Sequence, residues 1–268
     1  MQTILIAARV VISIIFLFYA SWSDYKTREV SNKVWIIYGP IGLILSLTEF
    51  LVYSPSKIPL YGLSVGVTFL MAFLLFYSGG FGGADSKAFM CISLALPFST
   101  EMLFSPLIPA ESSPLAMYLF PIVIFSNSVL IAATSACYIL FRNIIHRIRY
   151  GKYFFEGSLK TESIGKKIII FFTAYKLPIS KIKEKWHIYP MEDIDTTEIE
   201  QKRQLVILPK DEGRNEIIDR LNNAIETKTI EDYVWASPGL PMLIFVTLGL
   251  MIAIIFGDII WILISLFF

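Results

Sequence analysis

The sequence predicts an all-α polytopic membrane protein with six transmembrane helices and a small α+β cytoplasmic domain inserted before the last helix. Of its 268 residues, 55% are apolar, and the mean hydropathy is +0.64. Soluble domains are about 45–50% apolar and lack apolar stretches of about 20 residues. This chain has several such stretches, and it has one long polar region.

Six apolar segments are expected to span the membrane. They are Thr3–Ser21, Val34–Tyr53, Pro59–Tyr77, Ala84–Phe98, Leu115–Phe141 and Pro238–Phe268. The fourth is short of the roughly 20 residues that cross a bilayer, and it can span if the membrane thins or one end opens onto a water-filled cavity. The first lacks a basic start and a small-residue cleavage site, so we expect it to be retained rather than removed as a signal peptide. In the third, Gly62 and Gly66 form a GxxxG pair that predicts a close helix-packing face.

The orientation of the spans follows from the Lys and Arg residues of the connections, which favour the cytoplasmic side. The first connection, 22–33, and the start of the polar region at Arg142 are basic, whereas the connection 99–114 has no Lys or Arg. These counts place the first connection, the glycine-rich stretch 79–87 and the polar region in the cytoplasm. Both termini of this multi-pass cell-membrane protein are then expected outside.

The polar region divides the chain into three expected parts. Residues 1–141 hold five spans and the candidate catalytic carboxylates, residues 142–236 form a soluble cytoplasmic domain, and residues 237–268 form the sixth span. The first half of the polar region is basic and the second half is acidic. The basic half can contact anionic lipid, or the division of charge can reflect no more than a solvated surface.

Short elements are expected within the polar region. Apolar runs at Ile168–Phe172 and Leu205–Leu208 predict strands, and the apolar spacing over Glu216–Ile230 predicts a helix. Two histidines, His146 and His187, match no ligand pattern and are expected at a surface or an interface.

Three charged residues lie inside the expected spans: Arg9, Glu49 and Asp258. The orientation above places all three in the outer half of the membrane. We expect either one structural ion-pair cluster or separate side chains whose charged ends reach the membrane surface.

The stretch Gly79–Lys87 separates the third and fourth spans. Four of its first five residues are glycines, which allow backbone conformations with positive φ and the close approach of another chain. Near its end, Asp85 lies at the edge of an apolar span, where a carboxylate is costly and is by default functional. The alternative is a flexible loop in which Asp85 is the N-cap of the next helix.

A second carboxylate, Asp24, follows the first span, and the charge distribution places it at the depth of Asp85. The two residues are 61 positions apart and can meet if the first and fourth spans pack together. Like charges held close cannot both ionise, so such a pair keeps one proton and titrates as a unit. Its charged member can take a proton from water while its protonated member donates to a substrate carbonyl. This is aspartic-protease chemistry; the alternative is that both residues are interfacial caps or loop charges.

Other catalytic patterns are absent from the sequence, which has no Ser-His-Asp set, Cys-His set, P-loop or dinucleotide-binding fingerprint. Two cysteines, Cys91 and Cys137, lie in separate apolar runs without a CxxC pair, which argues against a zinc site or a disulfide. A net charge of +1 gives no indication of nucleic-acid binding. We therefore expect no metal, no cofactor and no nucleic-acid partner.

The segment Gly82-Gly83-Ala84-Asp85 resembles the GxGD motif of intramembrane aspartyl proteases. That family includes bacterial type IV prepilin peptidases, presenilin and signal peptide peptidase. Ala84 stands in place of a glycine, as in the looser archaeal form of the motif. Lys87 fits the D-x-K pattern that often follows.

The region of the first carboxylate also resembles this family. Asp24 followed by Val30-Ser31-Asn32 resembles the prepilin peptidase pattern of Asp followed by Ile/Val-Pro-Asn, with Ser31 in place of proline. The segment Ser237–Pro241 loosely resembles presenilin's PAL motif. Six spans with a cytoplasmic domain before the last resemble the archaeal preflagellin peptidases, whereas the cysteine-rich zinc domain of the bacterial enzymes has no counterpart here.

The resemblance implies an aspartic endopeptidase whose catalytic residues are Asp24 and Asp85. Residues that support the motifs or substrate binding are then Gly82, Gly83, Ala84, Lys87 and Asn32. It also implies a preflagellin or pilin-like substrate with a short basic leader, cut at the cytoplasmic membrane boundary, typically after a glycine. The lipid bilayer is the other expected partner, and the oligomeric state stays open.

Two other classes of function are considered. A proton- or cation-coupled transporter or channel would use Asp24 and Asp85 as ion sites, and it predicts paired interrupted helices in an inverted repeat. The sequence shows one glycine-broken site and no visible repeat. A membrane-anchored scaffold would bind a partner through residues 142–236, but it leaves the glycine-rich stretch unexplained.

Overall fold

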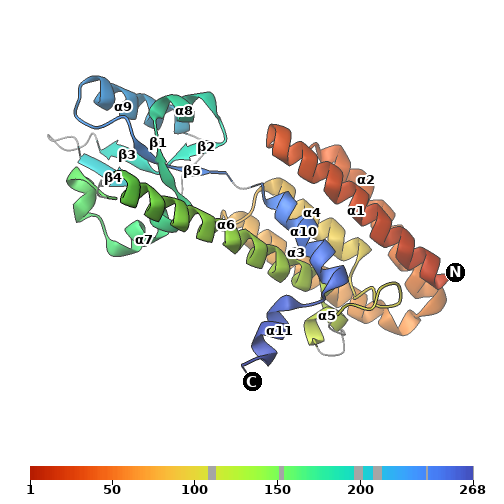
Figure 1. The fold of residues 1–268 in the computed structure, drawn as a ribbon. Coiled ribbons are helices and arrows are strands. Elements are labelled where there is room, and N and C mark those ends of the chain that lie inside the picture. Colours follow the sequence, from red (N-terminus) through yellow and green to blue (C-terminus); the bar gives the residue numbers. More distant parts are fainter. Residues whose placement is uncertain (108–112, 151–153, 196–201, 208–212, 240, 268) are drawn as a thin grey trace. The chain divides into compact units, whose positions relative to one another are not determined.

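The computed structural model describes the chain except for residues 108–112, 151–153, 196–201, 208–212, 240 and 268. The chain forms two compact units (Figure 1), which we call the helical unit and the sheet unit. The helical unit is Met1–Ala132 with Pro241–Phe268, and the sheet unit is Ala133–Leu240. The long helix α6 begins in the first and ends in the second.

The helical unit is built from apolar helices and short connections. Its helices, with the whole of α6, are α1 (Gln2–Thr27), α2 (Asn32–Tyr53), η1 (Pro55–Lys57), α3 (Ile58–Tyr77), α4 (Gly83–Ala95), α5 (Pro114–Tyr118), α6 (Phe120–Tyr150), α10 (Met242–Ile255) and α11 (Ile259–Ser265). Among the described residues, four segments are long and apolar enough to cross a membrane: α1, α2, α3 together with η1, and α6. Helices α10 and α11 make a fifth if the pair, bent by 60°, is one span. Length and composition therefore support four or five spans rather than all six.

The expected fourth span is the short helix α4, which has 13 residues. At 1.5 Å per residue it is about 20 Å long, less than the roughly 30 Å of a bilayer's hydrocarbon core. Its side chains Phe89 and Ile92 are fully buried. A Cβ on Gly42 of α2 would lie 2.8 Å from the Cβ of Ala95, so the glycine allows close contact between α2 and α4. Helix α4 is thus a central, protein-surrounded element.

Three expected spans have different boundaries in the structure. The expected fifth, Leu115–Phe141, is divided at Leu119 into α5 and α6, and α6 continues to Tyr150. Helix α1 continues past Ser21 to Thr27, so Asp24 lies on the helix rather than after it. The expected sixth span is interrupted, because Gly257 adopts a φ of +88° and Asp258 caps the new helix α11 by accepting a hydrogen bond from the Trp261 N–H at 3.1 Å.

The sheet unit is a small α+β domain, as expected. After α6 it contains η3 (Gly157–Thr161), α7 (Ile164–Thr173), β1 (Tyr175–Leu177), α8 (Ile179–Glu184), β2 (Ile188–Pro190), β3 (Glu192–Asp195), β4 (Lys202–Leu205), α9 (Arg214–Glu226) and β5 (Val234–Pro238). Strands β1, β5 and β2 form one antiparallel sheet in that order, and β3 pairs antiparallel with β4. Within the domain, Glu192 is fully buried and its carboxylate accepts hydrogen bonds from Arg203 and from the Trp235 N–H.

The predicted strand at Ile168–Phe172 is wrong, because this run lies in helix α7. The Ser163 hydroxyl caps the helix by accepting a hydrogen bond from the Lys166 N–H, a start signal that a short apolar run does not reveal. The predicted strand at Leu205–Leu208 is displaced, since β4 ends at Leu205 and Leu208 lies outside the described residues. The predicted helix at 216–230 is confirmed as α9, which ends at Glu226.

The GxxxG pair of α3 does not form the expected close-packing face within this chain. A Cβ on Gly62 or on Gly66 would meet no atom within 4 Å. The tight contact instead involves Gly249 of α10, where a Cβ would lie 2.1 Å from Ser128 Oγ and 2.7 Å from the Ile124 carbonyl oxygen of α6.

The substitution Gly249→Ala is expected to destabilise the helical unit by about 1–3 kcal/mol, because the added methyl must push α10 away from backbone atoms of α6. Unfolding of the purified protein in mixed detergent measures this loss. The matched control is Gly62→Ala, for which we expect no loss of stability. Equal effects of the two substitutions would contradict this account of the α6–α10 contact.

The three charged residues within the spans do not form one cluster. The guanidinium of Arg9 pairs with Glu49 and also donates hydrogen bonds to Ser46 Oγ at 3.1 Å and to the Ala95 carbonyl at 2.9 Å. The carboxylate of Asp258 accepts a hydrogen bond from Ser113 at 2.7 Å and caps α11. The expected cluster of all three residues is therefore wrong: Arg9 and Glu49 form an ion pair, and Asp258 has other partners.

Candidate active site

The glycine-rich stretch forms a tight connection between α3 and α4. Gly79 adopts a φ of +76°, which suits glycine. The N–H groups of Gly80 and Phe81 both donate to the Leu75 carbonyl, at 2.9 and 3.0 Å. The Phe81 ring is buried and stacks on Phe89, with ring centroids 5.5 Å apart. The stretch is therefore anchored at its centre, and its end is held next to α4.

Asp85 lies in the first turn of α4 and is half-buried. Its Oδ2 atom accepts a hydrogen bond from the Gly82 N–H at 3.0 Å. The N-cap of the helix is Gly82, so the alternative in which Asp85 is itself the N-cap is wrong, although the Asp85 side chain does contribute to capping. A Cβ on Gly82 would lie 3.1 Å from Oδ2. The glycine thus leaves room for the carboxylate to turn back over its own loop.

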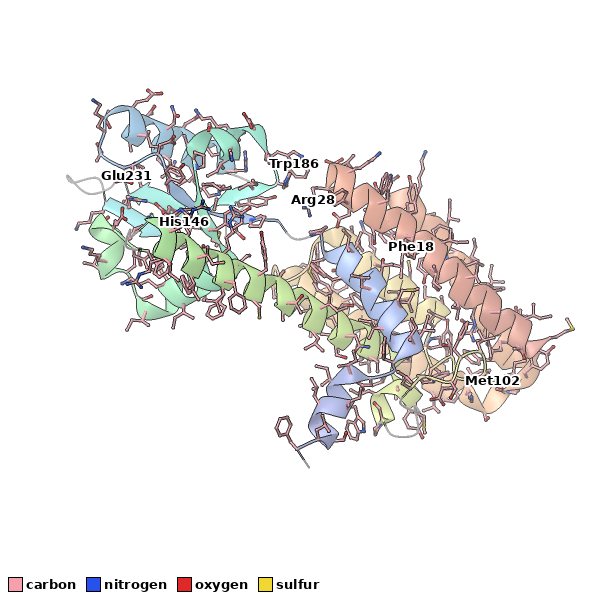
Figure 2. The ribbon with its side chains drawn as sticks, viewed as in Figure 1. Phe18, Arg28, Met102, His146, Trp186 and Glu231 are labelled. Carbon is pink, nitrogen blue, oxygen red and sulfur yellow. The ribbon has the colours of Figure 1, made fainter. Side chains whose placement is uncertain are left out.

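Asp24 lies near the end of α1, which packs against α10. The Ser21 hydroxyl donates to the Leu243 carbonyl at 2.8 Å and lies 2.7 Å from the Thr247 hydroxyl. One turn later, the half-buried Asp24 carboxylate interacts with the Arg28 charge and with the backbone amide of Leu243. Arg28 ends the helix in the left-handed conformation (Figure 2). Asp24 is therefore placed by two helices that are remote in sequence.

The two carboxylates lie on helices that contact each other, α1 and α4. The charge of Asp24 acts on the Asp85 carboxyl group, so the two side chains are close enough for electrostatic interaction. Helix α4 contacts both α1 and α10, which explains how residues so far apart in sequence come together. This arrangement places a pair of half-buried carboxylates at the ends of apolar helices.

The two motifs around these residues are also joined by a hydrogen bond. Lys87 donates from Nζ to Oδ1 of Asn32, with a distance of 2.7 Å. Asn32 begins α2 and Lys87 follows Asp85 on α4, so the bond links the start of α2 to the first turns of α4. Gly83 and Ala84, also expected to support the site, form the first turn of α4.

Two neighbours of Asp24 were not foreseen from the sequence. In the sequence, Arg28 served only as one of the basic residues that indicate the orientation of the spans. Leu243 could not be predicted as a neighbour of Asp24, because it interacts through its backbone rather than its side chain. The nearby segment Ser237–Pro241, expected to resemble the PAL motif, ends at Pro241, the N-cap of α10; Leu240 lies outside the described residues.

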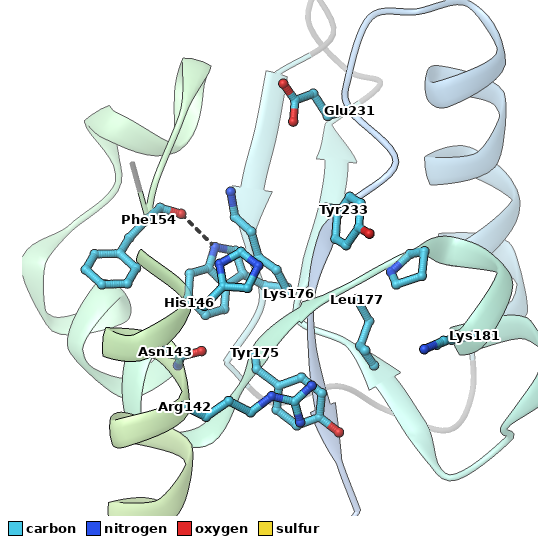
Figure 3. A pocket seen from close by; sticks show the side chains of 12 residues that line it. Arg142, Asn143, His146, Phe154, Tyr175, Lys176, Leu177, Lys181, Glu231 and Tyr233 are labelled. Carbon is cyan, nitrogen blue, oxygen red and sulfur yellow. Dashed lines mark hydrogen bonds between the residues drawn. The ribbon is translucent and has the colours of Figure 1, made fainter. Parts of the chain in front are cut away.

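A separate cavity of about 610 Å³ lies in the sheet unit (Figure 3). It is lined by cationic and aromatic side chains, including Arg142, whose guanidinium stands 3.6 Å from the ring centroid of Tyr175. His146, Phe154 and Trp235 also line the cavity, and Trp235 Nε1 donates a hydrogen bond to the Phe154 carbonyl at 3.2 Å. The lining contains no pair of carboxylates, so it offers no equivalent of the Asp24–Asp85 arrangement.

Metal-binding chemistry finds no support in the part of the chain that the structure describes. No group of three or more His, Cys, Asp or Glu side chains is placed there to hold a metal ion. Both cysteines are free thiols, Cys91 buried and Cys137 exposed.

The fold is that of a multi-pass helical membrane protein, and it carries half-buried carboxylates near the end of α1 and at the start of α4. Residues 11–140 match the model of the type IV leader peptidase family, and residues 166–259 match the model of the archaeal Peptidase A24 C-terminus, type II. The chain is thus similar to the type IV leader peptidase family over residues 11–140 and to the archaeal Peptidase A24 C-terminus over residues 166–259. It is therefore a peptidase, which confirms the expected resemblance and the expected enzyme class, an aspartic endopeptidase.

Curated relatives are similar over most of the chain. A preflagellin peptidase of Methanococcus voltae is 24% identical over 249 residues, covering 92% of this chain and 94% of that protein. A preflagellin peptidase of Methanococcus maripaludis is 24% identical over 264 residues, with the same coverage of 92% and 94%. A prepilin peptidase of Methanothermobacter thermautotrophicus is 27% identical over 122 residues, 45% of this chain and 32% of that protein.

Proposed function

We propose that this protein removes the leader peptides of preflagellin or pilin-like precursors at the cytoplasmic face of the membrane, and that Asp24 and Asp85 are its catalytic pair. The observation that carries the proposal is the placement of the two half-buried carboxylates on α1 and in the first turn of α4, two helices that contact each other, with the glycine-rich stretch directly before Asp85. The names of the relatives, two preflagellin peptidases and one prepilin peptidase, support the substrate class.

In the proposed reaction, the pair holds one proton between two carboxyl groups. The charged member takes a proton from the attacking water, while the protonated member donates to the carbonyl oxygen of the scissile peptide. The tetrahedral species then collapses: its C–N bond breaks, the leaving nitrogen takes the proton that the pair had gained from water, and a hydroxyl of the tetrahedral carbon returns a proton to the other carboxylate, so that the pair again holds one proton. The two groups titrate as a unit, so neither role is assigned to one residue.

The proposed membrane arrangement keeps six spans. Helix α4 crosses as a short, protein-surrounded span, because polar groups at its two ends can open onto water or onto other helices. The pair α10–α11 forms the sixth, and both termini lie outside. The division into 1–141, 142–236 and 237–268 follows from this arrangement, with the middle part in the cytoplasm.

The substrate is proposed to carry a short basic leader ahead of a hydrophobic helix. The hydrophobic helix remains in the bilayer while the leader reaches the cytoplasmic boundary, where the Asp pair lies. The stretch Gly79–Gly83 lets an extended leader approach closely, so that its backbone can pair with exposed main-chain groups.

The proposal is tested with the full chain reconstituted in liposomes and a synthetic precursor that has a basic leader, a glycine and an apolar helix. We expect one cut at the membrane boundary, identified by mass spectrometry of both products. The control precursor has a bulky residue in place of the glycine and is expected to be cut slowly. Ion or proton flux through the liposomes, without any cleavage, would favour the transporter alternative.

The Asn32–Lys87 hydrogen bond is expected to position α4 for this reaction. Replacing either partner, by Asn32→Ala or Lys87→Met, is expected to lower kcat about tenfold with little change in KM, since a hydrogen bond to a charged group contributes about 1.5 kcal/mol. The double variant is expected to be no worse than the single variants, because both remove the same contact. Lys33→Met, which alters an exposed neighbour of Asn32, is the matched control. Additive losses in the double variant would contradict a shared role.

A further inference from the structure

Helix α7 exposes a row of large apolar side chains at the surface of the sheet unit. The exposed fractions are 75% for Ile164, 53% for Ile168, 40% for Ile169 and 39% for Phe172. The spacing of Ile164, Ile168 and Phe172, four residues at each step, places them along one side of the helix. The opposite side is held in the domain by Ile170, which is fully buried. We call the four exposed residues the α7 apolar face.

Helix α9 of the same domain shows what an ordinary solvent-facing helix looks like here. It also buries one side, through Ile218, Leu221 and Ala224. Its exposed positions, however, are polar or charged, namely Asn215, Glu216, Asp219, Asn223 and Glu226. The α7 apolar face therefore does not reflect a general property of the domain's surface.

The α7 apolar face lies on a helix that is hydrogen-bonded to α6, a candidate membrane span. Helix α6 carries exposed apolar side chains at Tyr138, Phe141, Ile145 and Ile148, spaced along one side. The buried amide of Asn143 on α6 donates hydrogen bonds to the Phe171 and Ala174 carbonyls at the end of α7, at 2.9 and 2.8 Å. These bonds tie α7 to the end of a helix that is itself a candidate span.

Charge in this segment is suited to a lipid surface. Between Gly157 and Thr173 there are three lysines and one acidic residue, Glu162, which pairs with Lys166 at 3.1 Å. The segment therefore carries a net positive charge, and basic residues beside an apolar helix face favour the headgroup region of anionic membranes.

We propose that α7 lies in the plane of the membrane surface, with the α7 apolar face inserted at the boundary between headgroups and acyl chains of anionic lipid. The domain that follows α6 would then be held on the bilayer by a second contact besides α6 itself. A bilayer fits better than a water-exposed role, because four large apolar side chains on one short helix are costly in water.

The test uses the full-length protein in liposomes that contain anionic lipid. With Cys137 replaced by Ser, the only remaining native thiol is the buried Cys91, so a single introduced cysteine can carry a spin label. Labels are placed by Ile164→Cys, Ile168→Cys and, as the matched control on α9, Asn223→Cys. Collision rates with oxygen, which concentrates in lipid, and with a water-soluble nickel chelate are compared.

The labels at positions 164 and 168 are expected to collide severalfold more with oxygen than with the nickel chelate, and the label at 223 should show the reverse. Nickel accessibility at 164 and 168 equal to that at 223 would overturn the proposal. So would protection of these labels from both reagents together with disulfide cross-linking between two copies through Ile168→Cys, because a second copy would then cover the face. Two labelled positions are used so that failure of one variant to fold leaves the test intact.

Discussion

Cleavage by the Asp85→Asn variant is expected to fall by about 100- to 10,000-fold, the range attributed to loss of a general acid or base. Asparagine has the shape of aspartate, and its carbonyl oxygen can still accept the hydrogen bond that the Gly82 N–H donates at 3.0 Å. The substitution therefore keeps the cap of α4 and removes only the ionisable group. The rate is measured with the reconstituted enzyme and the synthetic precursor, under single-turnover conditions.

The same loss is expected for Asp24→Asn, and the double variant should be no slower than either single variant, since residues that act as a unit are not additive. The matched control is Glu29→Gln, which removes an exposed carboxylate from the connection that follows Asp24. Near-normal cleavage by Asp85→Asn would show that this residue is only a cap. Loss of activity in Glu29→Gln would show that cleavage depends on negative charge near this site in general rather than on Asp24 and Asp85.

Loss of Arg9 is expected to be among the most destabilising single changes in the helical unit. Its guanidinium pairs with Glu49, donates to Ser46 and to the Ala95 carbonyl, and is buried. Removing one partner of a buried pair costs about 3–5 kcal/mol, because the other charge stays buried without compensation. We therefore expect Arg9→Ala to lower the stability of the purified protein by about this amount in an unfolding titration.

A double-mutant cycle separates the ion pair from the other effects of Arg9. The pair Arg9→Ala and Glu49→Gln should show strong coupling, because the second change removes the charge that the first leaves alone. The pair Arg9→Ala and Asp258→Asn should be additive within about 0.5 kcal/mol, since Asp258 caps α11 and bonds Ser113 instead. Coupling of Arg9 to Asp258, or its absence for Glu49, would contradict these contacts.

The substrate helix is expected to contact the same bilayer region as the exposed side chains of the long helices. In the helical unit, large residues such as Phe18 on α1 point outward (Figure 2). Such side chains face acyl chains in a membrane protein, so their exposure carries no cost there. The polar residues on which the proposal depends, Asp24 and Asp85, lie instead at the ends of helices.

Local features of the sequence were sufficient for the class of the protein and for its candidate residues. Apolar runs predict membrane-spanning helices, because each spanning segment must by itself be apolar and long enough to cross the bilayer. In the same way, a carboxylate next to an apolar run is conspicuous on its own, so Asp24 and Asp85 could be singled out without knowing what lies near them. The glycines before Asp85 were equally visible as a flexible connection.

Only the tertiary structure decided which of these groups meet. Arg9 pairs with Glu49 rather than Asp258, Asn32 bonds Lys87, and α1, which carries Asp24, contacts both α4 and α10. Such partners depend on how helices distant in the chain pack against one another, and the residue pattern of one segment does not indicate which other segments contact it. Helix α7 was missed for a different, local reason: its apolar residues follow a helical period over too few positions to exclude a strand.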